Sequence, residues 1–170
     1  MWLYSLSQIQ YIFYGFETGV TELLKNIDGH KKNRSFEKMK EVSRWTKDAN
    51  IEIRGSFMIG LPGETPELAR ETIKRAIELD PEYAQFSITT PYPGTRLYKE
   101  IKDGKWGKFT TDDFSEFQGW NVVFLPNGYK DKGQVWEMEG HYSKTAVELA
   151  ESGRITLPDF GLDTTYFFGP

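Results

Sequence analysis

Residues 55–65 read GSFMIGLPGET, and the fold class expected for the whole chain follows from this stretch. Its first part is mostly apolar, as in a buried strand, and its Pro-Gly pair builds a tight turn into a helix. Thr65 is a natural N-cap, and Pro66 suits the first position of that helix. The stretch therefore predicts a strand at residues 51–59 and a helix at residues 66–79.

Strand and helix patterns alternate over the first two thirds of the chain. Apolar runs at residues 9–16 and 83–89 predict two further strands, and residues 35–48 predict a further helix. Short strands that alternate with helices of about ten to fifteen residues are typical of repeated strand–helix units with a parallel sheet. The expected fold class is α/β.

The two faces of the predicted strands differ in polarity, because successive side chains of a strand point to opposite faces. In the second strand, the more polar face carries Arg54, Ser56 and Met58. A doubly wound sheet usually buries both faces under helices. A polar inner face instead favours a barrel or half-barrel whose interior binds a ligand, although periodicity alone also permits a sheet with one face in water.

Composition narrows the classes of function. The chain has 170 residues, no cysteine and a formal net charge of −4. Without cysteine it has no disulfide, zinc ribbon, thiolate nucleophile or thiolate-held cluster of its own. The charges are interspersed, so nucleic acid is not an expected partner. No stretch approaches the roughly 18 apolar residues of a membrane span, and the start lacks the features of a signal peptide, so we expect a cytoplasmic protein.

A turn rich in glycine, proline or polar residues follows each predicted strand: GFETG at residues 15–19, GLPGET at 60–65 and TPYPGT at 90–95. The carboxyl ends of parallel strands meet at one edge of a sheet, where α/β proteins bind ligands. Each turn alone would serve only as a connection. Three of them in order predict a binding site at this edge.

Two runs of the sequence together resemble radical S-adenosylmethionine enzymes: GSFMIGLPGET at residues 55–65 and YAQFSITTPYPGT at residues 83–95. Within that superfamily the chain looks most like the class with an amino-terminal cobalamin-binding domain, and the resemblance covers roughly residues 9–140. It implies a partial TIM-type (β/α) barrel, of which this chain supplies parallel strands four to six, followed by a carboxyl-terminal α/β appendage.

The resemblance also implies a wall that binds S-adenosylmethionine. Glu17 would accept hydrogen bonds from the ligand, with Thr18 at the same site, and Arg54 and Ser56 would add polar contacts from the fifth strand. A structural hydrogen bond to a loop is the alternative for Glu17. An ion pair inside the barrel is an equal alternative for Arg54. The resemblance places the contacts near adenine at five further positions: Met58, Ile59, Gly60, Pro91 and Tyr92.

The chain departs from the family in what it lacks. The three-cysteine loop that holds a [4Fe-4S] cluster has no counterpart here, nor do the first three strands or the cobalamin domain. The resemblance therefore implies a fragment that is inactive alone and whose partner is the amino-terminal half of the barrel, from the same gene or another chain. The complete enzyme would cleave S-adenosylmethionine reductively to a deoxyadenosyl radical, or transfer a methyl group through cobalamin, with a small-molecule substrate.

The expected segments are the half-barrel at residues 1–106, an appended strand and helix at 107–152, and a loosely ordered tail at 153–170. Within the second segment we expect a strand at residues 121–125 and a helix at about 131–151. A fragment also predicts an exposed apolar edge along the first strand, where the third strand of the barrel would pair.

Two other classes of function stay open. A non-catalytic half-barrel would bind a nucleotide-like ligand or a partner protein, and stable monomeric folding would favour it. A metal-dependent hydrolase would draw on a set of acidic and histidine side chains: Glu17, Glu64, Asp112 and His141. Neither histidine of the chain stands in a metal-ligand spacing, which argues against the hydrolase.

Overall fold

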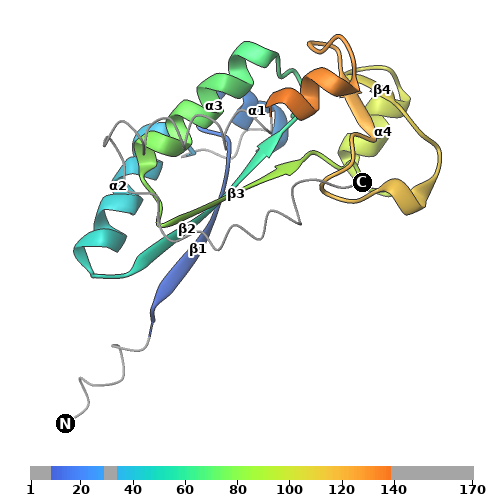
Figure 1. Ribbon diagram of the computed structural model, residues 1–170. Coiled ribbons are helices and arrows are strands. Elements are labelled where there is room, and N and C mark those ends of the chain that lie inside the picture. Colours follow the sequence, from blue (N-terminus) through green and yellow to red (C-terminus); the bar gives the residue numbers. More distant parts are fainter. Residues whose placement is uncertain (1–8, 29–33, 139–170) are drawn as a thin grey trace.

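The computed structural model describes residues 9–28 and 34–138 (Figure 1). Strands and helices alternate through most of this part, in the following order: β1 (Tyr11–Glu17), α1 (Thr21–Asp28), α2 (Phe36–Asp48), β2 (Glu52–Ile59), α3 (Pro66–Leu79), β3 (Tyr83–Ile88) and α4 (Arg96–Lys102). A 3-10 helix, η2 (Phe114–Glu116), and two short strands, β4 (Gly107–Phe109) and β5 (Phe124–Pro126), come next, and residues 132–138 are helical.

The sheet has the order β1-β2-β3, and both pairs of neighbouring strands are parallel, which confirms the expected α/β class. The helix predicted at residues 66–79 is present with the same bounds, and the Thr65 hydroxyl accepts a hydrogen bond from the Leu68 amide. Helices α1 and α4 were not expected from the sequence. Each is short, with 8 and 7 residues, so neither offers a long periodic pattern.

Helices α2 and α3 lie along one side of the sheet (Figure 1). The apolar side chains of the strands face these helices and form the main core. Phe57 is the centre of a row of rings on three adjacent strands, with its ring centroid 5.6 Å from that of Phe16 and 5.1 Å from that of Phe86. Burying such a row contributes a large part of the folding free energy, because each aromatic side chain removes extensive apolar area from water.

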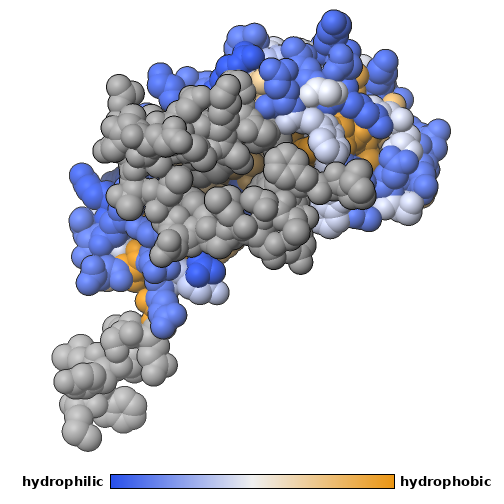
Figure 2. Space-filling view, in the orientation of Figure 1, coloured by the Kyte–Doolittle hydropathy of each residue, from blue (hydrophilic) through white to orange (hydrophobic). Residues whose placement is uncertain are grey.

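The opposite face of the sheet is exposed or half-buried. Arg54 lies between Phe13 and Tyr83, and Ser56 lies between Gly15 and Gln85. The alternation of a polar and an apolar face therefore matches the expectation from the sequence. Strand β1 has β2 as its only neighbour among the described residues, and Phe13 is 53% exposed. Figure 2 shows hydrophobic surface at the amino-terminal end of β1.

The segment after α4 packs on the three-stranded sheet through the same core. Strands β4 and β5 pair in antiparallel fashion, and β5 begins three residues later than the strand expected at 121–125. The main core includes Val122, Val135 and Met138 beside residues of the sheet. Residues 132–138 form the described part of the helix expected at 131–151, and the rest of that helix and the tail at 153–170 lie outside the described residues.

Among residues 9–28 and 34–138, no helix combines the length and the apolar character that a membrane crossing requires.

Candidate functional site

The turns after β1, β2 and β3 meet at the carboxyl edge of the sheet, as the parallel order requires. The Thr89 amide at the end of β3 donates to the carbonyl oxygen of Ile59 at the end of β2, at 2.9 Å. Left-handed backbone conformations occur in all three turns: Glu17 has a φ of 63°, Gly60 of 80° and Gly94 of 85°. Glycine adopts this conformation without a steric cost, whereas glutamate does not.

Glu17 is the unusual residue of this edge. The register between β1 and β2 shifts between Gly15 and Glu17, so the strand bulges where the side chain leaves the sheet. The Glu17 side chain folds back over Gly15, where an added Cβ atom would lie 2.9 Å from Oε1 of the carboxylate. A residue other than glycine at position 15 would therefore displace this carboxylate.

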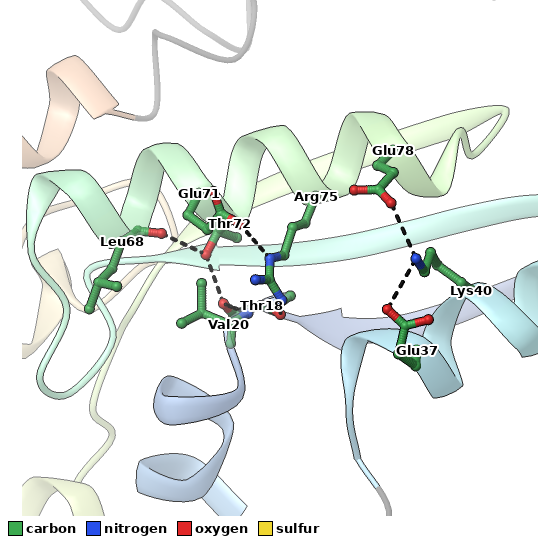
Figure 3. Close-up of polar contacts among 10 residues, drawn as sticks. Thr18, Val20, Glu37, Lys40, Leu68, Glu71, Thr72, Arg75 and Glu78 are labelled. Carbon is green, nitrogen blue, oxygen red and sulfur yellow. Dashed lines mark hydrogen bonds and ion pairs between the residues drawn. The ribbon is translucent and has the colours of Figure 1, made fainter.

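Thr18 turns away from the open edge. Its side chain is fully buried, and its hydroxyl lies 2.7 Å from the hydroxyl of Thr72 on α3 (Figure 3). The Val20 amide donates to the same hydroxyl at 3.0 Å. The structure therefore places Thr18 in a contact between the turn and a helix, next to Glu17 in sequence but on the other side of the backbone.

The candidates on β2 divide between the two faces. Ser56 and Met58 are half-buried on the polar face, whereas Ile59 is fully buried in the core beneath the helices. Arg54 stacks on the ring of Tyr11 at 3.7 Å, near the amino end of the sheet. It lies four positions before Met58, a span of about 13 Å along a strand. The structure does not bring Arg54 together with the candidates at the carboxyl edge.

The turn after β2 is held from inside by a buried carboxylate. Glu64 is fully buried, and its Oε1 accepts hydrogen bonds from the Gly60 amide and from the Tyr129 hydroxyl, each at 2.5 Å. Its Oε2 has no hydrogen-bond partner among the described residues. Burial raises the pKa of Glu64 to about 7, and the bonds from Tyr129 and Gly60 only partly oppose this rise.

Sequence reasoning weighed Glu64 only as a metal ligand and missed Tyr129. These two residues are 65 positions apart, and no local pattern links them.

The turn after β3 presents one candidate and buries the other. Tyr92 is 51% exposed, whereas Pro91 is buried. The Thr95 hydroxyl donates to the Tyr92 carbonyl at 2.7 Å and also caps α4, which fixes the backbone beside the exposed ring. Of the nine candidates, Glu17, Ser56, Met58, Gly60 and Tyr92 therefore lie at or near one edge of the sheet.

Sequence comparison finds partial relatives. The chain is 37% identical over 109 residues to an uncharacterized methyltransferase of Pyrococcus horikoshii, a match that covers 60% of this chain and 23% of that protein. It is 34% identical over 77 residues to the anaerobic magnesium-protoporphyrin IX monomethyl ester cyclase of Cereibacter sphaeroides, covering 45% of this chain and 13% of the cyclase. No protein-family model matches the chain.

The fold is similar to that of the radical S-adenosylmethionine methyltransferase TsrM from Kitasatospora setae, solved with cobalamin and a [4Fe-4S] cluster bound. The TM-score is 0.52 at 22% sequence identity, and the match covers 74% of this chain and 24% of TsrM. The resemblance to radical S-adenosylmethionine enzymes is confirmed. The chain thus spans about a quarter or less of each protein that it matches here.

The residues of this chain suit some of the cofactors of radical S-adenosylmethionine enzymes and not others. At the carboxyl edge, the Glu17 carboxylate lies over Gly15, and a carboxylate can accept hydrogen bonds from hydroxyl groups such as those of a ribose. The [4Fe-4S] cluster does not fit, because its usual ligands are thiolates and the chain has no cysteine. Residues 9–28 and 34–138 also contain no group of three acidic or histidine side chains placed to hold a metal, and His141 lies outside them.

Proposed function

We propose that this chain forms part of the adenosyl-binding wall of a radical S-adenosylmethionine enzyme. The observation that carries the proposal is the position of Glu17: a carboxylate on a left-handed backbone, folded over Gly15, at the carboxyl edge of a parallel sheet. Residues held in sparsely populated conformations cluster at ligand sites, and the carboxyl edge is where α/β sheets bind ligands.

Each side chain at the edge has a role in this proposal. The Glu17 carboxylate accepts hydrogen bonds from the ribose hydroxyls, because an ionised carboxylate is purely an acceptor. Ser56 adds a hydroxyl on the polar face, and Met58 adds a polarisable apolar surface. Tyr92 offers an exposed ring on which adenine stacks. Gly60 is buried beside Val135 and supplies the left-handed backbone of the turn after β2.

Buried positions contribute indirectly. Thr18, Ile59 and Pro91 shape the backbone of the three turns, since their side chains are enclosed. Arg54 lies at the amino end of the sheet, in contact with Tyr11, and has no part in the adenosyl site in this proposal.

The activity of the complete protein is a proposal of the same kind. We infer that the three strands are strands four to six of a (β/α) barrel and that its amino-terminal half pairs along β1. The complete enzyme would cleave S-adenosylmethionine reductively to a deoxyadenosyl radical, or transfer a methyl group with cobalamin, in the cytoplasm on a small-molecule substrate. The chain alone is inactive in this proposal, since it supplies no cysteine for the cluster.

Calorimetry with S-adenosylmethionine on the purified chain tests the proposal. We expect the wild-type chain to bind and Glu17→Gln to weaken binding about tenfold or more, because hydrogen bonds to a charged group contribute about 1.5–3 kcal/mol. The matched control is Glu22→Gln, which changes an exposed glutamate in the first turn of α1 and should leave affinity unchanged.

Absence of binding by the folded wild-type chain, or equal binding by Glu17→Gln, would overturn the proposal. Binding of adenosine nucleotides with no preference for S-adenosylmethionine would support the non-catalytic binding module instead.

A further inference from the structure

The turn that carries Glu17 is strained. The Thr18 amide donates to the Phe16 carbonyl at 2.7 Å, which closes a three-residue turn centred on Glu17. With a φ of 63° at its centre, this is the rare form of the γ-turn. A conformation of this kind persists only where the surrounding structure holds it, so the neighbours of the turn must supply the restraint.

The first restraint is a directed chain of hydrogen bonds from the turn to α3. The Thr72 hydroxyl donates to the Leu68 carbonyl at 3.1 Å, so its single proton is used inside the helix. The Thr18 hydroxyl, 2.7 Å away, must therefore donate to Thr72, and it accepts in turn from the Val20 amide (Figure 3). Both hydroxyls are fully buried, so losing either partner leaves an unsatisfied polar group.

The second restraint comes from Arg75, one turn further along α3. Its Nη1 donates to the Gly19 carbonyl at 2.6 Å, and its Nε donates to Glu71 at 2.7 Å. The guanidinium also lies over the ring of Phe36, 4.8 Å from the centroid. Gly19 approaches so closely that an added Cβ would lie 2.6 Å from Cβ of Arg75. The contacts with Glu71 on α3 and Phe36 on α2 therefore fix the Arg75 side chain in the orientation that reaches Gly19.

We propose that Thr72 and Arg75 are positioning residues that hold Glu17 in its left-handed conformation and thereby set the affinity of the site for the adenosyl ligand. Residues 72 and 75 lie on one face of α3, because positions three apart on a helix are neighbours. Together they hold Thr18 and Gly19, the two residues that follow Glu17, against α3. They do so on the face of the turn that points away from the proposed ligand. The inference about affinity rests on the proposed function, whereas the restraint on the turn does not.

Three variants test the restraint. Thr72→Val keeps the shape of the side chain but removes the acceptor for Thr18. Thr72→Ser keeps the hydroxyl, and Ile73→Val is a control that loosens the core beside α3 but leaves the pair of threonine hydroxyls intact. Amide hydrogen exchange at Thr18 and Val20, followed by NMR, reports the turn directly. Calorimetry with S-adenosylmethionine reports its effect on binding.

We expect Thr72→Val to speed exchange at the turn and to weaken binding, each about tenfold, as the loss of one buried hydrogen bond predicts. Thr72→Ser should stay within twofold of the wild type for both measurements, and Ile73→Val should leave the turn unchanged. Equal exchange in Thr72→Val and Ile73→Val would overturn the inference. A wild-type chain that does not bind the ligand would overturn the proposed function and the link to affinity, while the exchange rates would still decide whether Thr72 holds the turn.

Discussion

Replacing the buried Glu64 with glutamine should change how the stability of the protein depends on pH. Burial raises the pKa of Glu64 from 4.5 to about 7 in the folded chain. The folded state therefore holds the proton more tightly than the unfolded state. Below pH 4.5 both states are protonated, and as the pH rises to about 7 the unfolded state ionises first, so stability falls through this window.

The size of the loss follows from the shift of the pKa. A change from 4.5 to about 7 corresponds to about 3 kcal/mol. Glutamine does not titrate and still offers a carbonyl oxygen to the Gly60 amide and the Tyr129 hydroxyl. The free energy of unfolding of Glu64→Gln, minus that of the wild type, should therefore rise by about 3 kcal/mol between pH 4.5 and pH 7.5.

Urea unfolding of both proteins at several values of pH, followed by tryptophan fluorescence, measures this difference, and the other titrating groups cancel. Glu67→Gln is the control, because Glu67 is exposed on the same helix and hydrogen bonds from its own backbone amide and from Thr65 lower its pKa. The control should therefore lose stability relative to the wild type as the pH rises. A difference for Glu64→Gln that stays constant with pH would refute the reasoning, since it would mean that folding does not raise the pKa of Glu64.

Three further changes have expected outcomes. Gly128→Ala places a Cβ 2.2 Å from the Glu64 carbonyl oxygen and should cost about 2 kcal/mol or more in urea unfolding, whereas Gly119→Ala, whose nearest contact would be 3.9 Å away, should cost much less. Gly15→Ala should weaken binding of S-adenosylmethionine in calorimetry, because its Cβ would lie 2.9 Å from Oε1 of Glu17 and would displace this carboxylate; a large fall in the melting temperature with unchanged affinity would contradict this. Tyr129→Phe should raise the pKa of Glu64 above its wild-type value, because the hydrogen bond from the Tyr129 hydroxyl lowers this pKa. The fall of unfolding free energy with pH should therefore extend to higher pH, and an unchanged pH profile would count against the hydrogen bond.

Local features of this chain were readable without its structure. The bounds of α3 follow from Thr65, Pro66 and an apolar periodicity, all of which act within one or two helical turns. The polar and apolar faces of β2 follow in the same way, because side chains of a strand must alternate. The same alternation places Ile59 on the apolar face, where the structure buries it, although the family resemblance had marked it as a ligand contact.

The contacts that shape the candidate site are of another kind. Thr18 meets Thr72 across 54 positions, and Glu64 meets Tyr129 across 65. No local sequence pattern predicts such pairs. The first depends on how the turn after β1 packs on α3, and the second on how the segment after α4 packs on the turn after β2. The resemblance pointed to Glu17 as a ligand contact, but the strained backbone beneath it and the helix that restrains it emerge only when distant parts of the chain are brought within hydrogen-bond distance.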